Sequence, residues 1–175
     1  MLDTGDADFV RRLEDLPDPL AMFDGDPTGR IITIETQRGC VFHCNFCFYN
    51  KDFAIRNRRF DLDRVKSALR SWLQKPIHSA FLMDPVFNLN AARAKDICAF
   101  IAEHNVHRIP LHTEVWAEFI DRELAQLMAA AGFTHVEIGL QTTDADVLAL
   151  TERRLRTERF LAGVGYLKEA GVPFE

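Results

Sequence analysis

The stretch Cys40-Val41-Phe42-His43-Cys44-Asn45-Phe46-Cys47 holds three of the four cysteines of this 175-residue chain. Three residues separate the first pair of cysteines, and two separate the second pair. The stretch closely follows an apolar, β-branched run, Ile31-Ile32-Thr33-Ile34, which predicts a buried strand. Gly39 permits a sharp turn just before the first cysteine. We therefore expect a loop at the carboxyl end of a strand, with three thiolates that converge on one soft metal centre, either an iron–sulfur cluster, zinc or Cu(I).

Other uses of these cysteines are less well supported by the pattern. With His43, the three cysteines could form a structural Cys3His zinc site, but such sites usually draw their ligands from two separated pairs. The fourth cysteine, Cys98, lies beside Ile97 and Ile101 on an expected helix, where it is predicted to be a small core residue. An extracellular disulfide framework does not fit this spacing with one cysteine left over. The pattern favours a cluster, and zinc stays open as the alternative.

The rest of the chain alternates between strand and helix patterns. This alternation predicts parallel strands joined by right-handed crossovers, with functional groups at the carboxyl ends of the strands. We expect helix N-caps at Asp61, Asn90 and Asp121 and a helix end at Gly132. Further strands are expected near residues 78–85, 108–115 and 136–141, further helices at 143–153 and 157–170, and the start of a fifth strand at 172–175.

Composition narrows the class of protein. Hydrophobic residues make up 47% and charged residues 27% of the chain, which is typical of one globular domain. The net charge of −5 argues against non-specific nucleic-acid binding. No apolar run reaches the roughly 18–20 residues that span a bilayer, and the acidic start does not resemble a signal peptide. Cluster-binding thiols require a reducing compartment, so we expect a cytoplasmic protein without a membrane partner.

The cysteine spacing, with an aromatic residue directly before the third cysteine, resembles the cluster-binding signature of the radical-SAM superfamily. The flanking Ile34-Glu35-Thr36-Gln37-Arg38-Gly39 and Phe48-Tyr49-Asn50-Lys51 are most similar to the branch in which a cobalamin-binding domain often precedes the radical domain. The resemblance implies that Cys40, Cys44 and Cys47 hold a [4Fe-4S] cluster and that S-adenosylmethionine chelates its open iron. Reductive cleavage then gives a 5′-deoxyadenosyl radical, which abstracts hydrogen from a small-molecule or peptide substrate.

The same resemblance implies partners and an architecture. A reductant such as ferredoxin or flavodoxin would supply the electron, and cobalamin on a domain not present in this chain could support methyl transfer. The family core is a partial (βα) barrel of six units, of which the chain shows four and the start of a fifth strand. We therefore expect an N-terminal stub and linker at 1–30, an incomplete core domain at 31–175, and truncation at both ends. The alternative is a non-catalytic fragment or a zinc-stabilised binding module that uses the same loop.

The resemblance also assigns cofactor contacts at the strand ends. Asp84, in Met83-Asp84-Pro85, is the best candidate for the acid that meets the amino group of S-adenosylmethionine in the family; the alternative is a turn residue before proline. Glu114 would reach the ribose or the amino group, or else form a structural salt bridge. Gln141, in Gly139-Leu140-Gln141-Thr142, would bind the ribose, Arg153 the carboxylate, and Phe46 the adenine. Glu152 replaces the asparagine that usually precedes the arginine. The pattern does not indicate the substrate.

Overall fold

The computed structural model describes residues 12–47, 49 and 57–175. Its centre is a parallel sheet of four strands in the order β1-β4-β5-β6. These strands span Ile31–Ile34, Ser79–Leu82, Leu111–Val115 and Phe133–Ile138. The register pairs Ile34 with Leu82, Leu82 with Thr113, and Val115 with Ile138, so the carboxyl ends of all four strands meet along one edge. The predicted α/β fold with parallel strands is confirmed, and the barrel is not closed.

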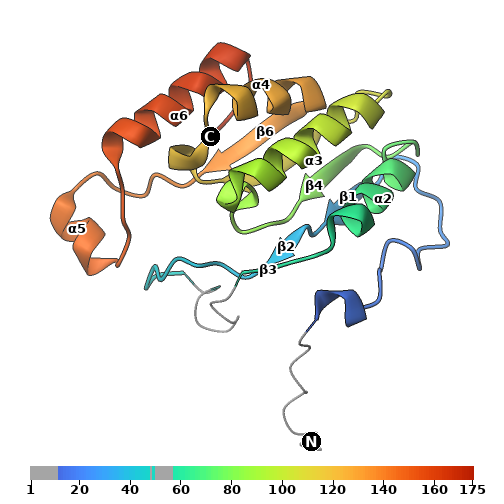
Figure 1. Ribbon diagram of the computed structural model, residues 1–175, viewed down its shortest axis with the longest axis horizontal. Helices are drawn as coiled ribbons and strands as arrows, with labels where there is room; N and C mark the ends of the chain where they lie inside the picture. The colour runs from blue at the N-terminus through green and yellow to red at the C-terminus, as the bar shows by residue number, and fades with distance from the viewer. Residues whose placement is uncertain (1–11, 48, 50–56) are drawn as a thin grey trace, which may run out of the picture.

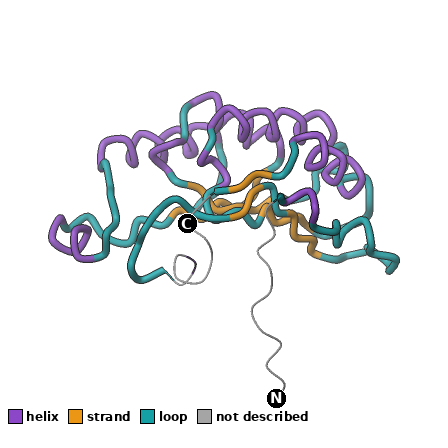
Figure 2. The backbone as a smooth tube through the Cα atoms, turned by 60° about the horizontal axis from the view of Figure 1, so that its bottom comes forward, coloured by secondary structure: helices purple, strands orange, loops and turns teal. Residues whose placement is uncertain are grey.

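Four helices cover one face of this sheet. They are α2 (Leu62–Trp72), α3 (Ala91–His104), α4 (Arg122–Ala131) and α6 (Thr157–Ala170), and neighbours in this series pack against one another. Figure 2 shows these helices on one side of the strands, while the short α5 (Ala145–Leu150) lies apart from them, at the left of Figure 1. The described residues also form three short 3-10 helices: η1 (Leu13–Asp15), η2 (Phe87–Leu89) and η3 (Ala117–Phe119).

The helix boundaries follow from capping. Asp61, Asn90 and Asp121 each accept backbone N–H bonds at the start of α2, α3 and α4, which confirms all three predicted N-caps. Gly132 ends α4 in the left-handed region, with a φ of 96°. The apolar stripes between these caps form the core, in which Leu69, Leu82 and Ile97 are at most 1% exposed. Burial of each such side chain contributes at most about 1.5–3 kcal/mol to the free energy of unfolding.

The fourth strand of the sheet lies three residues earlier than predicted. The sequence pattern favoured residues 136–141, whereas β6 spans Phe133–Ile138. Gly132 turns the chain directly from α4 into the strand, and the chain leaves extended geometry before Gln141, whose φ is 65°. The predicted start of a fifth strand is confirmed by a parallel bridge between Val136 and Phe174.

A two-stranded antiparallel ladder, which the sequence reasoning missed, closes the base of the cysteine loop. β2 (Gln37–Arg38) pairs with β3 (Arg58–Arg59), so the segments before and after the cysteines lie side by side. Each strand has only two residues, too few for an alternating hydrophobic pattern to be visible. The ladder fixes where the loop leaves and rejoins the core.

Candidate functional site

The cysteine loop is held at its ends by hydrogen bonds. Gly39 has a φ of 97°, a conformation that favours glycine, and its N–H donates to the Tyr49 hydroxyl at 3.1 Å. Its carbonyl accepts from Asn57 Nδ2 at 3.2 Å. Within the loop, the N–H of Cys47 donates to the carbonyl of Cys44 at 3.0 Å, which closes a turn between the second and third cysteines.

The loop is also tied to a distant part of the chain. The backbone N–H of Asn45 donates to the carbonyl of Thr151 at 3.1 Å, and its side-chain amide donates to the carbonyl of Leu150 at 2.5 Å. Both carbonyls belong to the C-terminal end of α5. These bonds satisfy carbonyls that a helix end leaves without an intrahelical partner. The second and third cysteines are therefore positioned against α5.

A cavity of about 430 Å³ lies between this loop and the carboxyl ends of the strands. All three cysteines line it, together with four of the five residues predicted to contact the cofactor. Phe46 has 51% of its surface exposed, although it lines this cavity. The lining residues that matter here are Cys40, Cys44, Cys47, Phe46, Glu114, Gln141 and Arg153. We call this space the cysteine cavity.

Arg153 reaches into the cysteine cavity from just beyond α5. Glu152, before it, has a φ of 53°, and this left-handed turn directs the arginine back toward the sheet. The guanidinium donates to the carbonyl of Gly139, and its Nη1 lies 3.7 Å from Cys44 Sγ. Glu152 forms no ion pair with Arg153 or with any other residue in the described part of the chain, so the acid does not draw the guanidinium away.

The end of β6 shapes the opposite wall. Gln141 has a φ of 65°, a conformation that is uncommon outside glycine, and such strained residues concentrate at functional sites. A Cβ placed on Gly139 would lie 3.0 Å from Gln141 Nε2 and 3.5 Å from Arg153 Nη2. Glycine at position 139 therefore lets both polar side chains approach the backbone.

Two glutamates face each other across the last two strands. Glu114 of β5 is paired in register with Glu137 of β6, and both line the cysteine cavity. Burial, and then the charge on Glu137, raise the pKa of Glu114. No salt bridge to either carboxylate occurs within residues 12–47, 49 and 57–175, so the structural salt bridge considered for Glu114 is absent there. Its contact with a cofactor stays a prediction.

Asp84 follows β4 as expected, but it is the one predicted cofactor contact that does not line the cysteine cavity. It is 1% exposed, and its carboxylate accepts from the N–H of Thr36 at 2.7 Å, from the N–H of Gln37 at 3.0 Å and from the Thr36 hydroxyl. Burial raises the pKa of Asp84 to about 6, and these donors oppose the rise. Asp84 does not line the cysteine cavity, whereas its neighbours Met83 and Pro85 do. The carboxylate thus anchors the bend between β1 and β2, and the arrangement does not favour its predicted contact with the cofactor.

The chemistry of the three thiols fits a cluster. Burial raises the pKa of Cys40, and the nearby Cys44 and Cys47 raise it further, while Arg153 lowers it. No group of three or more His, Cys, Asp or Glu among the described residues is close enough to hold a single metal ion. The described residues therefore show no preformed Cys3His site with His43, and the zinc-stabilised binding module stays the alternative. Cys thiolates hold [4Fe-4S] clusters, and all three thiols line the cysteine cavity.

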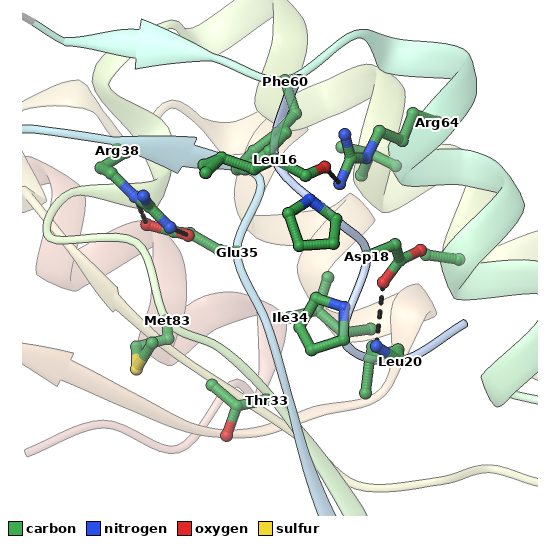
Figure 3. Close-up of a pocket in the computed structure, with 14 residues that line it drawn as sticks. Leu16, Asp18, Leu20, Thr33, Ile34, Glu35, Arg38, Phe60, Arg64 and Met83 are labelled. Atoms are coloured by element: carbon green, nitrogen blue, oxygen red, sulfur yellow. Dashed lines mark hydrogen bonds and ion pairs between the residues drawn. The ribbon is translucent and has the colours of Figure 1, made fainter. Parts of the chain in front are cut away.

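Figure 3 shows the residues that line a second cavity, of about 350 Å³. It lies between the segment from Leu16 to Leu20, the end of β1 and α2. Glu35 and Arg38 form an ion pair at its edge, as Figure 3 shows. Met83 lines both cavities, so this side chain borders each of them.

A family model described as the radical SAM superfamily matches residues 34–174. The chain belongs to the radical SAM superfamily. The match includes the last residue of β1, the cysteine loop, the strands β4, β5 and β6, and every residue predicted to contact the cofactor. No described helix has the length and apolar character needed to cross a membrane.

Related radical SAM proteins include methyltransferases. The chain is 29% identical over 127 residues to tryptophan 2-C-methyltransferase from Streptomyces laurentii, covering 69% of this chain and 21% of that protein. It is 22% identical over 145 residues to hopanoid C-3 methylase from Methylococcus capsulatus, and this match covers 80% of this chain and 27% of that protein. The chain thus spans about a fifth to a quarter of the length of these two curated relatives.

Solved structures confirm the fold. The radical S-adenosylmethionine methyltransferase TsrM from Kitasatospora setae, with tryptophan and a SAM analogue bound, matches with a TM-score of 0.74 at 23% identity. That match covers 85% of this chain and 30% of TsrM. The cobalamin-dependent S-adenosylmethionine radical enzyme OxsB, with aqua-cobalamin bound, matches with a TM-score of 0.68 at 20% identity. That match covers 82% of this chain and 23% of OxsB. Another TsrM structure holds cobalamin and a [4Fe-4S] cluster.

The sequence reasoning missed two aromatic residues of this site. Trp116 follows β5 and, like Phe42 of the cysteine loop, lines the cysteine cavity. The signal available was the position of Trp116 directly after a predicted strand, where functional groups gather in parallel α/β folds.

Proposed function

We propose that this chain is the core of a radical SAM enzyme that methylates a carbon of an organic substrate. In this proposal Cys40, Cys44 and Cys47 hold a [4Fe-4S] cluster, and S-adenosylmethionine binds beside it in the cysteine cavity. The observation that carries the proposal is that one cavity brings together the three thiols and four polar or aromatic side chains from separate elements. Methyl transfer, with cobalamin on a part of the protein outside this chain, is supported by the methyltransferases among the relatives.

The residues of the cysteine cavity suit the parts of the cofactor. Phe46 offers a flat apolar face for the adenine. The amide of Gln141 can donate to and accept from vicinal ribose hydroxyls. Glu114, without a salt bridge in the described part of the chain, can accept from a hydroxyl or from the amino group. The Nε of Arg153 is buried without a hydrogen-bond partner among the described residues, so it remains available to a carboxylate.

In this proposal the protein binds the cluster, orients S-adenosylmethionine beside it and shields both from water. The thiolates of Cys40, Cys44 and Cys47 would hold the cluster, and the other residues of the cysteine cavity would hold S-adenosylmethionine beside it. When bound, the cluster supplies the electron that cleaves S-adenosylmethionine to a 5′-deoxyadenosyl radical for hydrogen abstraction. The electron would come from a reductant such as ferredoxin or flavodoxin in a reducing compartment. The division into a linker at 1–30 and a core domain at 31–175 belongs to the same proposal.

The first test is cluster assembly. Purified protein is reconstituted anaerobically with iron and sulfide, and the iron and acid-labile sulfide per chain are measured together with the visible spectrum. We expect a brown protein whose metal is lost in the Cys40→Ala, Cys44→Ala, Cys47→Ala triple variant. Cys98→Ala is the matched control, because Cys98 is fully buried in the core, outside the cavity. A colourless protein with one tightly bound zinc would establish the binding-module alternative instead.

The second test is cofactor turnover. Reconstituted protein is incubated with dithionite and S-adenosylmethionine, and 5′-deoxyadenosine is quantified. We expect formation that falls at least tenfold in Gln141→Ala and is unchanged in Gln74→Ala, an exposed glutamine far from the cavity. A fully loaded protein that binds no S-adenosylmethionine would refute the assignment of the cavity while leaving the cluster site intact.

A further inference from the structure

Trp116 connects the cysteine loop to the end of β5. Its ring stacks on Phe42, which lies between the first two cysteines, with ring centres 4.0 Å apart and planes at 18°. Phe119 packs against both rings, with centres 6.4 Å away. Trp116 is 9% exposed and lines the cysteine cavity. It is therefore a fixed aromatic wall and not a mobile surface side chain.

The same ring holds a cation. The guanidinium carbon of Arg153 lies over the Trp116 ring, 4.3 Å from its centre. The guanidinium also donates to the carbonyl of Gly139, and its Nη1 points at Cys44 Sγ. These three contacts come from three different elements, so they fix both the position and the orientation of a group that is always positively charged.

We propose that Trp116 is a positioning residue that holds Arg153 against Cys44, and that this contact raises the reduction potential of a cluster on the three cysteines. The inference rests on the proposed function. Reduction adds one negative charge to a cluster that already has thiolate ligands. A nearby cation, and a hydrogen bond to a ligand sulfur, stabilise the reduced form more than the oxidised form. The effect is strong here because the cation is partly buried.

Trp116 is needed because the side chain of Arg153 can adopt other conformations. It lies between Glu152 and Arg154 on a loop whose side chains are exposed on either side of it. Without an aromatic face, the long side chain could turn toward solvent or toward the neighbouring carboxylate.

The test is a redox titration of the reconstituted protein, in which the reduced cluster is followed by electron paramagnetic resonance. In Arg153→Gln we expect about tenfold less reduced cluster relative to oxidised cluster at a fixed potential, which corresponds to a shift of about −59 mV for one electron. Trp116→Leu should shift the potential in the same direction, and Trp116→Phe by less. Arg154→Gln, which removes the adjacent exposed cation, is the matched control and should leave the potential unchanged.

A double-mutant cycle separates positioning from a direct effect. If Trp116 acts through Arg153, then Trp116→Leu adds nothing in the Arg153→Gln background. Additive shifts, or a wild-type potential in fully loaded Arg153→Gln, would overturn the inference. Should Trp116→Leu fail to fold or to take up iron, the cycle is run with Trp116→Phe. A wild-type protein that assembles no cluster refutes the proposed function and this inference together, whereas a loaded protein with an insensitive potential refutes only this inference.

Discussion

Asn88 and the backbone of Trp116 exchange two hydrogen bonds, each 2.9 Å long. Asn88 Nδ2 donates to the carbonyl of Trp116, and the N–H of Trp116 donates to Asn88 Oδ1. Asn88 is fully buried in η2, which follows β4, so no water competes for these bonds. The pair joins the segment after β4 to the segment after β5, and it fixes the backbone from which the Trp116 ring projects.

Asn88→Asp should lower the free energy of unfolding. The aspartate keeps the acceptor for the Trp116 N–H but removes the donor, and it places a carboxylate where there is no solvent. We expect a loss of about 2–4 kcal/mol at neutral pH, measured by urea denaturation. Gln74→Glu makes the same amide-to-acid change at an exposed position and should stay within about 0.5 kcal/mol of the wild type. Equal stabilities for the two variants would contradict the role given to Asn88.

Two glycines of α6 should respond in opposite ways to alanine. A Cβ on Gly163 would lie 1.9 Å from the carbonyl oxygen of Ala117, whereas a Cβ on Gly165 would meet nothing within 4 Å. Gly163→Ala must therefore push α6 away from η3, and we expect it to lower the free energy of unfolding by about 2 kcal/mol or more. Gly165→Ala should raise it by about 0.5–1 kcal/mol, because glycine disfavours helix. Thermal denaturation of both variants, monitored by circular dichroism, checks the contrast.

The buried carboxyl of Asp84 should make stability depend on pH. Burial raises the pKa of Asp84 from its ordinary value of 3.8 to about 6 in the folded protein. A group that binds its proton more tightly when folded contributes its full stability below about pH 4, and this contribution is lost as the pH rises through 6. Relative to that of Asp84→Asn, the free energy of unfolding of the wild type should therefore fall by about 2–3 kcal/mol between pH 4 and pH 7.

The measurement is urea denaturation of both proteins at several pH values, with the difference between them plotted against pH. Asp96→Asn, an exposed carboxylate on α3, controls for the loss of one charge. A difference that stays constant from pH 4 to pH 7 would show that the three hydrogen bonds from Thr36 and Gln37 offset the burial of Asp84 completely.

Gly139→Ala should weaken cofactor binding without unfolding the protein. The added Cβ would crowd Gln141 Nε2, at 3.0 Å, and Arg153 Nη2, at 3.5 Å, so both side chains must move. We expect affinity for S-adenosylmethionine to fall about tenfold, or about 1.4 kcal/mol, in equilibrium dialysis with loaded protein. Gly165→Ala is the control at a glycine outside the cavity. Unchanged affinity in Gly139→Ala would mean that neither side chain contacts the ligand.

Local signals in the sequence predicted most of the fold. The caps at Asp61, Asn90 and Asp121 and the left-handed Gly132 depend on neighbouring residues only, so they could be identified without tertiary structure. The position of β6 was wrong because its first residues, Phe133-Thr134-His135, lack an apolar run. The bounds of this strand are determined by its pairing with β5 and not by the local sequence pattern.

The candidate site was predicted less completely than the fold. The three cysteines could be identified because their spacing is itself the signal. Asp84 was placed by its position before a proline, but its actual partners, Thr36 and Gln37, lie 48 and 47 positions away. The stack of Arg153 on Trp116 is likewise a long-range contact, so neither residue's neighbours reveal it.

The bonds from Asn45 to the end of α5 have a consequence for the order of assembly. Asn45 and Leu150 lie 105 positions apart, so their contact closes a loop that contains three strands of the sheet and several helices. Contacts between such distant positions close long loops and tend to form late. Metal insertion should accordingly follow the collapse of the sheet and its helices, and a nascent chain should acquire its iron only after α5 has been synthesised.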